Sequence, residues 1–304
     1  MVVNNKKKFI RSPLFYVGDK YKIISQIKKF FPKQIDRFIE PFCGGGSVFL
    51  NTEANFYLIN DINSYVIKLH KFLISNSKNT NKFWNEIKKN IEKYNLSASY
   101  FEKNIPLEYK EQFVKTYYAE YNKESYIKMR EDFNRNKNNI LLLYLLVIYG
   151  FNRMLRFNSY GNFNSPVGNV DFNKNVYEAL ELYFEYVLNK NIKIYSMDYE
   201  KFIKRVIPTS NDFIYLDPPY LIANSEYNKL WNEESEIRMI KILDQLNEKN
   251  IKFAISNILY HRKKTNGTFN EWAKKYNIVK IKSNYISYHD NTKKDSIEVL
   301  VKNY

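Results

Sequence analysis

The chain has 304 residues, of which 44% are hydrophobic and 17% aromatic. This composition excludes a disordered chain and allows one large or two modest domains with a real core. The longest apolar run, residues 140–151, is too short to span a bilayer, and no apolar core follows the basic N-terminal segment. We therefore expect neither a membrane anchor nor a signal peptide. A single cysteine, Cys43, excludes an internal disulfide, and three widely separated histidines argue against zinc. The composition fits a reducing cytoplasm.

The chain carries 48 Lys and Arg against 32 Asp and Glu, a net charge of +16. A basic protein attracts polyanions, because each neutralised phosphate releases counterions and adds affinity. Lys and Asn are abundant throughout, so codon bias in an AT-rich genome is an alternative cause of the charge. Charge favours a nucleic-acid partner but does not identify one.

Short apolar runs typical of strands occur near both ends of the chain. They span residues 36–42, 55–61, 191–198, 211–219, 251–256, 277–283 and 296–304. Segments with helical periodicity, such as 18–31 and 233–250, lie between several of them. This alternation predicts a doubly wound α/β sheet with a mostly parallel core.

The middle of the chain has a different pattern. Residues 72–172 are rich in Lys, Tyr and Asn at helical spacing and include an apolar helix at 140–150. A stretch interrupted by Gly, Asn and Pro follows and predicts a loop or hairpin. We interpret 72–172 as a mainly helical insertion between the second and third strands, with 1–71 and 173–304 forming the other domain.

A glycine-rich turn follows the first strand, in "FIEPFCGGGSVFL" at 38–50. Glycines let the backbone pass close to a ligand, and we expect a helix to start after them with free N–H groups. Phe49 stands where the dinucleotide fingerprint has a small residue, which argues against a pyrophosphate site. A tight strand–helix turn with no ligand is the alternative.

Asp61 ends the second strand, in "LINDIN" at 58–63. An acid at this place in a doubly wound fold accepts hydrogen bonds from ribose hydroxyls. The alternative is that Asp61 caps the next helix. Together with the glycines, Asp61 predicts a nucleoside cofactor without a demanding phosphate site, which S-adenosylmethionine fits.

The run "FIYLDPPYL" at 213–221 begins as a buried strand and ends on Asp217 and two prolines. Prolines cannot extend a central strand, so they stiffen a turn at its carboxyl end. The Asp217 carboxylate and the Pro218 carbonyl are then two fixed acceptors, and Tyr220 adds an aromatic face. This set suits an exocyclic amino group on a planar base. An Asp-Pro-Pro turn with a core tyrosine is the alternative.

The chain resembles the Dam-type (α-group, DPPY) DNA adenine-N6 methyltransferases. Eight blocks agree in order and spacing over nearly the whole length: "SPLFYVGDK" at 12–20, "FIEPFCGGGSVFL", "ND" at 60–61, "RFNSYGNFNSPVG" at 156–168, "SMDYEKF" at 196–202, "DPPY" at 217–220, "FAISN" at 253–257 and "EVLVKNY" at 298–304. The resemblance implies a Rossmann-like methyltransferase fold with an inserted, mainly helical DNA-recognition domain. It also implies S-adenosylmethionine as cofactor and double-stranded DNA as substrate.

The resemblance further implies roles for individual residues. Those expected to hold the cofactor are Tyr16, Gly18, Lys20, Phe42, Gly44, Gly46, Asp61, Asp198 and Tyr199. Those expected at the reacting centre are Asp217, Pro218, Pro219 and Tyr220. Those expected to contact DNA are Arg156, Asn158 and Tyr160. Within the cofactor set, Asp61 would bind the ribose hydroxyls and Asp198 the amino group of the cofactor's adenine.

Two positions depart from the family pattern. Phe15 stands where many relatives carry a basic residue that can reach a guanine, and Tyr160 stands where members that recognise GATC usually carry one. Arginine or lysine is the usual reader of guanine. Both positions argue against GATC without removing it from consideration. The rival functions are an RNA or protein-glutamine methyltransferase, a non-catalytic nucleic-acid-binding module and a nucleotide-dependent oxidoreductase. A monomeric enzyme in a prokaryotic or phage setting, with or without a partner restriction endonuclease, fits the resemblance.

Overall fold

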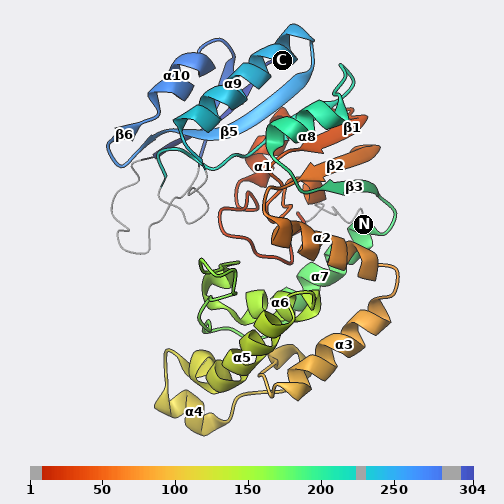
Figure 1. The fold of residues 1–304 in the computed structure, drawn as a ribbon, viewed down its shortest axis with the longest axis vertical. Coiled ribbons are helices and arrows are strands. Elements are labelled where there is room, and N and C mark those ends of the chain that lie inside the picture. Colours follow the sequence, from red (N-terminus) through yellow and green to blue (C-terminus); the bar gives the residue numbers. More distant parts are fainter. Residues whose placement is uncertain (1–8, 224–230, 283–295) are drawn as a thin grey trace, which may run out of the picture.

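A computed structural model describes residues 9–223, 231–282 and 296–304. Within these ranges the centre of the fold is one sheet in the order β3-β2-β1-β4-β5-β8-β7, with the short β6 paired to β5 (Figure 1). The strands are β1 Arg37–Glu40, β2 Phe56–Asn60, β3 Asn191–Tyr195, β4 Phe213–Leu216, β5 Lys252–His261, β6 Lys264–Thr265, β7 Asn277–Ile281 and β8 Ser296–Lys302. Each predicted apolar run coincides with one of these strands, except that β5 continues five residues beyond the run predicted at 251–256.

The core of the sheet is parallel. β1 pairs in parallel with β2 on one side and β4 on the other, and β3 and β5 extend the two halves. β8 is antiparallel to both β5 and β7. The chain therefore changes direction across the sheet between β1 and β4. In doubly wound sheets, ligands bind at the carboxyl ends of the strands beside such a point.

Alternation along the strands produces two cores, one on each face of the sheet. Phe213 and Tyr215 of β4 belong to one buried cluster, whereas Ile214 and Leu216 belong to the other. Figure 1 shows the flanking helices: α8 Tyr199–Val206, α9 Glu233–Glu248 and α10 Gly267–Ala273 supply residues of the second cluster, and α1 Ile24–Ile27, α2 Ser64–Asn76 and α7 Lys174–Val187 supply residues of the first. The doubly wound prediction is confirmed.

The middle of the chain is a helical region beside the sheet (Figure 1). Its helices are α3 Thr80–Lys93, α4 Leu107–Gln112, α5 Tyr117–Arg135 and the largely buried α6 Ile140–Tyr149. A hairpin follows α6, with antiparallel bridges from Gly150 to Val167 and from Phe157 to Phe163. Helix α2 continues through Phe72, so the division between residues 71 and 72 lies inside a helix and stays a prediction.

Two helix predictions were wrong in extent. The segment predicted from residue 18 becomes helical only at Ile24, because Gly18 has φ +82° and the Asp19 carboxylate accepts from Tyr21 N in a turn. After the glycine turn, a three-residue 3-10 helix, Phe49–Asn51, replaces the expected helix, because the chain must reach β2 at Phe56. Among the described residues, no helix combines the length and hydrophobicity needed to cross a membrane.

Candidate active site

Asp217 lies directly after β4 and is fixed by two neighbours. Its Oδ1 is 2.7 Å from Lys20 Nζ and accepts a hydrogen bond from Tyr220 Oη at 3.1 Å. The Tyr220 hydroxyl is also 3.2 Å from Glu298 Oε1, on β8. The Lys20 ammonium lies 5.0 Å from the centre of the Tyr220 ring. The structure therefore brings together three predicted residues from distant parts of the chain.

The Asp217 side chain is about one-fifth exposed, with 19% of its surface accessible, whereas that of Lys20 is only 6% accessible. Burial raises the pKa of Asp217 above its ordinary value, and Lys20 and Tyr220 oppose that rise. In the described part of the chain, Oδ2 of Asp217 accepts no hydrogen bond. One oxygen is held in place and the other remains available as an acceptor.

The glycine-rich turn lies at the carboxyl end of β1, and Asp61 stabilises it. Gly44 has φ +46° and donates its N–H to Asp61 Oδ2 at 2.9 Å, while Asn63 N donates to Oδ1 at 2.8 Å. Tyr16 packs on the turn: a Cβ added at Gly45 would lie 2.6 Å from the Tyr16 Cβ. The turn, Asp61 and Tyr16 thus meet as predicted. Burial also raises the pKa of Asp61.

His70 supports the same turn from α2, a role that sequence reasoning missed. Its Nε2 is 2.9 Å from the Gly44 carbonyl oxygen, and its Nδ1 is 3.2 Å from the Tyr183 hydroxyl on α7. Complete burial lowers the pKa of His70 to about 4, so the ring is neutral at pH 7. A lone histidine in a helix gave no signal, because its partner is a backbone carbonyl reached only in the fold.

A third carboxyl group, Glu40 at the end of β1, lies close to Asp217 and Asp61. It is buried, and Oε2 has no hydrogen-bond partner. Burial raises its pKa well above the ordinary range, and the negative charges of Asp217 and Asp61 raise it further. Its position directly before the Pro41–Phe42 pair and the glycines was a usable signal. Glu298 was also missed, although it begins the last matching block.

Aromatic rings gather near the beginning of α8. Tyr199 lies 5.2 Å from Phe42 and 5.7 Å from Trp231, measured between ring centroids. Asp198 caps α8 by accepting from Glu200 N, and its Oδ2 pairs with Arg238 at 3.1 Å. The predicted residues Phe42, Asp198 and Tyr199 are therefore close together. Trp231 is a further member, and its buried Nε1 has no hydrogen-bond partner.

The predicted DNA-contacting residues Arg156 and Asn158 form hydrogen bonds within the hairpin itself. Arg156 donates from Nε to Asn164 Oδ1 at 3.0 Å and from Nη2 to the Asn164 carbonyl at 2.9 Å. Asn158 Oδ1 accepts from the backbone N–H groups of Tyr160 and Asn162. Arg156 and Asn158 thus shape the hairpin, whereas the Tyr160 side chain is presented to solvent with 85% exposure. Their predicted contacts with DNA stay predictions.

The chain matches the D12 class N6 adenine-specific DNA methyltransferase model over residues 16–286. It belongs to that family. It is 36% identical to the type II methyltransferase M.FokI of Planomicrobium okeanokoites over 97% of this chain and 43% of the relative. It is 33% identical to the modification methylase StsI of Streptococcus sanguinis, over 99% of this chain and 44% of the relative. The chain thus spans less than half the length of these two curated relatives.

The DNA adenine methylase of Escherichia coli is 31% identical over 81% of this chain and 80% of the relative. The suspected family and the methyltransferase-type α/β fold are therefore confirmed. Methyltransferases of this family generally use S-adenosylmethionine. In the described ranges, no group of three or more His, Cys, Asp or Glu residues could hold a metal ion.

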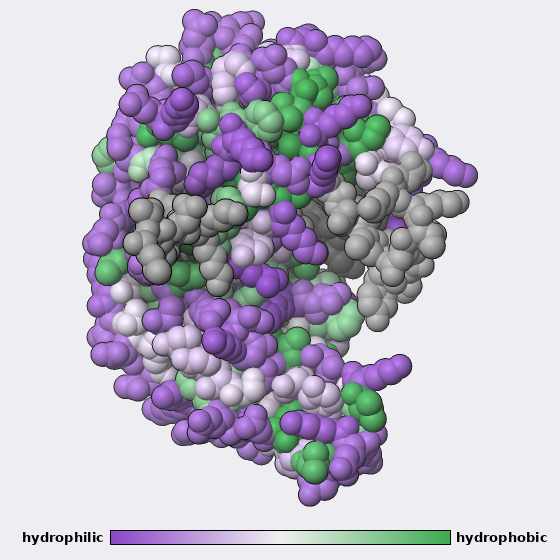
Figure 2. All heavy atoms as spheres, turned by 180° about the vertical axis from the view of Figure 1, so that it is seen from behind, coloured by the Kyte–Doolittle hydropathy of each residue, from purple (hydrophilic) through white to green (hydrophobic). Residues whose placement is uncertain are grey.

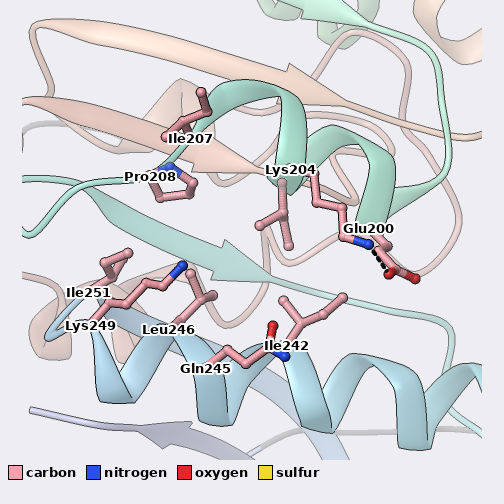
Figure 3. Close-up of a pocket in the computed structure, with 10 residues that line it drawn as sticks. Glu200, Lys204, Ile207, Pro208, Ile242, Gln245, Leu246, Lys249 and Ile251 are labelled. Atoms are coloured by element: carbon pink, nitrogen blue, oxygen red, sulfur yellow. Dashed lines mark hydrogen bonds and ion pairs between the residues drawn. The ribbon is translucent and has the colours of Figure 1, made fainter.

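A separate pocket of about 240 Å³ lies between α8 and α9 (Figure 3). It includes Ile251, directly before β5, and Pro208, before β4, so it reaches the amino ends of these strands. Glu200 and Lys204 on its rim pair with each other at 2.7 Å. None of the predicted methyltransferase residues lines it. The pocket is therefore separate from the predicted residues that gather at the carboxyl ends of β1 and β4.

Proposed function

We propose that this chain transfers a methyl group from S-adenosylmethionine to the exocyclic amino nitrogen (N6) of an adenine in duplex DNA. The observation that carries the proposal is the Asp217 carboxylate, which ends β4 between Lys20 and Tyr220. The chain that carries this acceptor belongs to a family of adenine-specific DNA methyltransferases. An RNA or protein-glutamine substrate is the alternative, and a methyl-transfer assay on DNA, RNA and protein distinguishes it from a DNA substrate.

The residues at the carboxyl edge of the sheet fit the cofactor. The Gly44 and Gly46 backbones adopt positive φ, and a Cβ at Gly46 would lie 2.3 Å from Phe49 Cε1, so the turn has no room for side chains. Asp61 supplies carboxylate oxygens for the ribose hydroxyls, and the ring of Tyr199 packs beside Phe42. Lys20, with Tyr16 and Gly18, would hold the amino-acid end. When bound, S-adenosylmethionine supplies a sulfonium methyl group, whose carbon–sulfur bond breaks as the nitrogen–carbon bond forms.

Asp217 and Pro218 activate the adenine amino group. Its nitrogen is a poor nucleophile, because its lone pair is delocalised into the ring. Acceptors at Asp217 and the Pro218 carbonyl hold both N–H bonds, favour a pyramidal nitrogen and free the lone pair. They also stabilise the positive charge that develops on the nitrogen. No proton needs to leave before transfer, since the methylated nitrogen is acidic and releases one afterwards.

Lys20 keeps Asp217 in the form that this chemistry needs. Burial favours the protonated carboxyl group, which would donate at one oxygen instead of accepting. The Lys20 charge at 2.7 Å opposes that effect and occupies Oδ1, leaving Oδ2 for the substrate. Lys20 thereby links the cofactor side of the site to the acceptor of the amino group. Pro219 completes the rigid turn, and Tyr220 offers its ring beside the acceptor.

The target must leave the helix, because an amino group paired inside a duplex cannot reach a pocket at a sheet edge. The flipped adenine would stack on Tyr220. We assign the DNA contact to the hairpin, through Arg156, Asn158 and Tyr160. The net charge of +16 favours binding of a polyanion. A monomer suffices for this arrangement. A cytoplasmic setting, prokaryotic or phage, completes the proposal, with the enzyme either solitary or paired with a restriction endonuclease.

A tritiated-methyl transfer assay tests the function. The chain is incubated with labelled S-adenosylmethionine and adenine-containing DNA, RNA or protein. We expect label in DNA, recovered as N6-methyladenine. Label in RNA or in protein glutamine instead would overturn the DNA proposal. Sequencing the methylated DNA by position then identifies the recognised motif, and a motif containing GATC would show that the interpretation of Phe15 and Tyr160 is wrong.

A further inference from the structure

Two arginines lie on one aromatic ring at the border between the N-terminal segment and the helical region. The Arg153 guanidinium carbon is 3.7 Å from the centre of the Phe15 ring, and that of Arg11 is 4.7 Å from the same centre. Phe15 is 8% exposed, so the ring is fixed. We name Arg11, Phe15 and Arg153 the arginine stack. None of the three was assigned a role in cofactor binding or methyl transfer.

One donor of the Arg153 guanidinium has no hydrogen-bond partner: its Nη1 is buried without one. No ion pair or side-chain hydrogen bond joins Arg153 to any acid in the described ranges. Burial lowers its pKa to about 10, with repulsion from Arg11 adding to this, while Tyr144 and Asp171 oppose the decrease. The group is still a cation at pH 7. A buried cation with an unsatisfied donor is costly, and a ligand with acceptor atoms would remove that cost.

The backbone on both sides of the contact is strained. Phe15 has φ +46°, and the consecutive residues Asn152 and Arg153 have φ +51° and +53°. Asparagine adopts such values readily, but phenylalanine and arginine rarely do, and the cost at Phe15 and at Arg153 is on the order of 1 kcal/mol or more each. Strain of this kind persists where the surrounding structure maintains it, and it concentrates at ligand-binding sites. The contact between Phe15 and Arg153 is therefore a maintained feature of the fold.

The arginine stack lies between the two parts of the proposed DNA site. Phe15 directly precedes Tyr16, which packs on the glycine turn, and Arg153 lies in the hairpin, between its Gly150–Val167 and Phe157–Phe163 bridges. The Tyr144 hydroxyl of α6 lies 3.3 Å from the Pro13 carbonyl and ties the N-terminal segment to the helical region. In Figure 1 the N-terminal segment runs beside the end of α6 and the hairpin.

We propose that Arg153, held on the Phe15 ring, donates to the O6 and N7 acceptors of a guanine in the recognised sequence and so determines specificity at that base pair. This inference rests on the proposed DNA substrate. Arg11, on the same ring, is a positioning residue that limits the movement of Phe15. Sequence reasoning found no basic residue at position 15, and the structure supplies a guanidinium from position 153 instead.

A base edge suits Arg153 better than a phosphate does. A guanidinium stacked on a buried ring has its plane fixed, and a fixed fork matches the two coplanar acceptors of guanine. A phosphate can be bound by a mobile ammonium group, and the chain carries 48 Lys and Arg residues from which to supply a cation. Figure 2 shows hydrophilic residues over most of the visible face. Stacking and backbone strain do not add charge to the site, but they orient the N–H groups of this one guanidinium.

The test compares guanine with 7-deazaguanine, which lacks the N7 acceptor, at each guanine of the recognised sequence. Binding of S-adenosylhomocysteine-loaded protein to each duplex is measured for wild type, Arg153→Lys, Arg153→Met and the control Arg135→Met. Arg135 lies in the same region, is 73% exposed and, among the described residues, pairs only with Asp132. We expect one guanine at which deaza substitution weakens wild-type and Arg135→Met binding about 5- to 150-fold. Arg153→Met should bind the two duplexes equally well, and Arg153→Lys, which keeps the charge but loses the rigid fork, should discriminate between them less than wild type does.

Position-resolved methylation sequencing should agree, with Arg153→Met accepting other bases at that position. A uniform loss of affinity on all sequences, with a shallower salt dependence, would show a phosphate contact and overturn the proposal. Variants that keep wild-type specificity would show a structural role and overturn it too. Thermal unfolding checks each variant. If neither variant folds, the wild-type scan decides alone, and the absence of a sensitive guanine refutes the inference.

The binding measurement separates this inference from the proposed function. A protein that binds DNA with one sensitive guanine but transfers no methyl group would contradict only the function. A protein that methylates adenine in DNA, yet tolerates 7-deazaguanine everywhere, would contradict only the role of Arg153.

Discussion

The carboxyl edge of the sheet and the hairpin after α6 both carry polar residues predicted to bind ligands, but the two regions hold them differently. At the sheet edge, Asp61 accepts two backbone N–H groups, and Asp217 accepts from Lys20 and Tyr220. In the hairpin, Arg156 is engaged within its own loop, and Tyr160 is 85% exposed. The sheet edge is ordered by the core beneath it. The hairpin is anchored to α5, where Asn134 forms hydrogen bonds with the Phe163 backbone, and it presents its tip to solvent.

This difference should separate the effects of substitutions. A change at the sheet edge removes a fixed acceptor, so it should alter methyl transfer or cofactor affinity while DNA still binds. A change at the hairpin tip touches neither acceptor and should alter DNA affinity alone. If a substitution in one region altered the property assigned to the other, the two regions would act as one unit.

The largest effect is expected for Asp217→Ala. Loss of the acceptor for the amino group should lower kcat at least about 100-fold, as removal of one preorganised hydrogen-bonding group does elsewhere. S-adenosylmethionine affinity, measured by calorimetry, should stay within a few-fold of wild type. Asp36→Ala is the control, since Asp36 is exposed and distant from the site in the sheet. Turnover near wild type in the Asp217 variant would sink the assignment.

A smaller effect is expected for Asp61→Ala. The substitution removes one charge-assisted hydrogen bond to the Gly44 N–H of the turn, another to the Asn63 N–H, and the proposed ribose acceptor. Cofactor affinity should fall about 10- to 100-fold by calorimetry, while DNA binding measured without cofactor stays unchanged. If Asp61→Ala weakens DNA binding as strongly as cofactor binding, the sheet edge and the hairpin are not separable.

At the hairpin tip, Tyr160→Ala should weaken DNA binding about fivefold or more through a lost base or sugar contact. Cofactor affinity and thermal stability should not change, because the side chain is 85% exposed. The matched control is Tyr109→Ala, which removes a 38% exposed tyrosine from α4. Equal losses in both variants would indicate a general surface effect and contradict a specific contact at residue 160.

The sequence predicted the sheet edge well because its groups follow strands directly. Asp61 and Asp217 each come one residue after a parallel strand, so strand pattern alone places them at one edge. Lys20 was expected near the same edge, but only the fold shows its ammonium on Asp217. Its partner is almost 200 positions away, and no local pattern encodes that pairing.

Groups whose roles depend on tertiary contact were not predictable. Glu298 meets Tyr220 because β8 inserts antiparallel between β5 and β7, a register that strand periodicity does not specify. Arg153 was overlooked because its chemistry depends on a ring 138 positions earlier and on two consecutive residues of positive φ. The start of the first helix was predicted wrongly, because Gly18 at positive φ forms a turn where a regular first helical turn was expected.

The smallest expected effect concerns His70, which lies between the glycine turn at the sheet edge and the helical region that carries the hairpin. Its helix, α2, leads into the helical region, and its partner Tyr183 lies on α7, the helix that returns from it. The pKa of His70 is about 4 in the folded chain and 6.5 ordinarily, so the unfolded chain binds the proton first as pH falls. Its contribution to stability is present above pH 6.5 and is lost toward pH 4. Denaturant unfolding should therefore show a decrease of roughly 1 kcal/mol between pH 7 and pH 6. His70→Gln, which keeps a donor for the Gly44 carbonyl, should lack that decrease, and an equal decrease in both proteins would assign it to other groups.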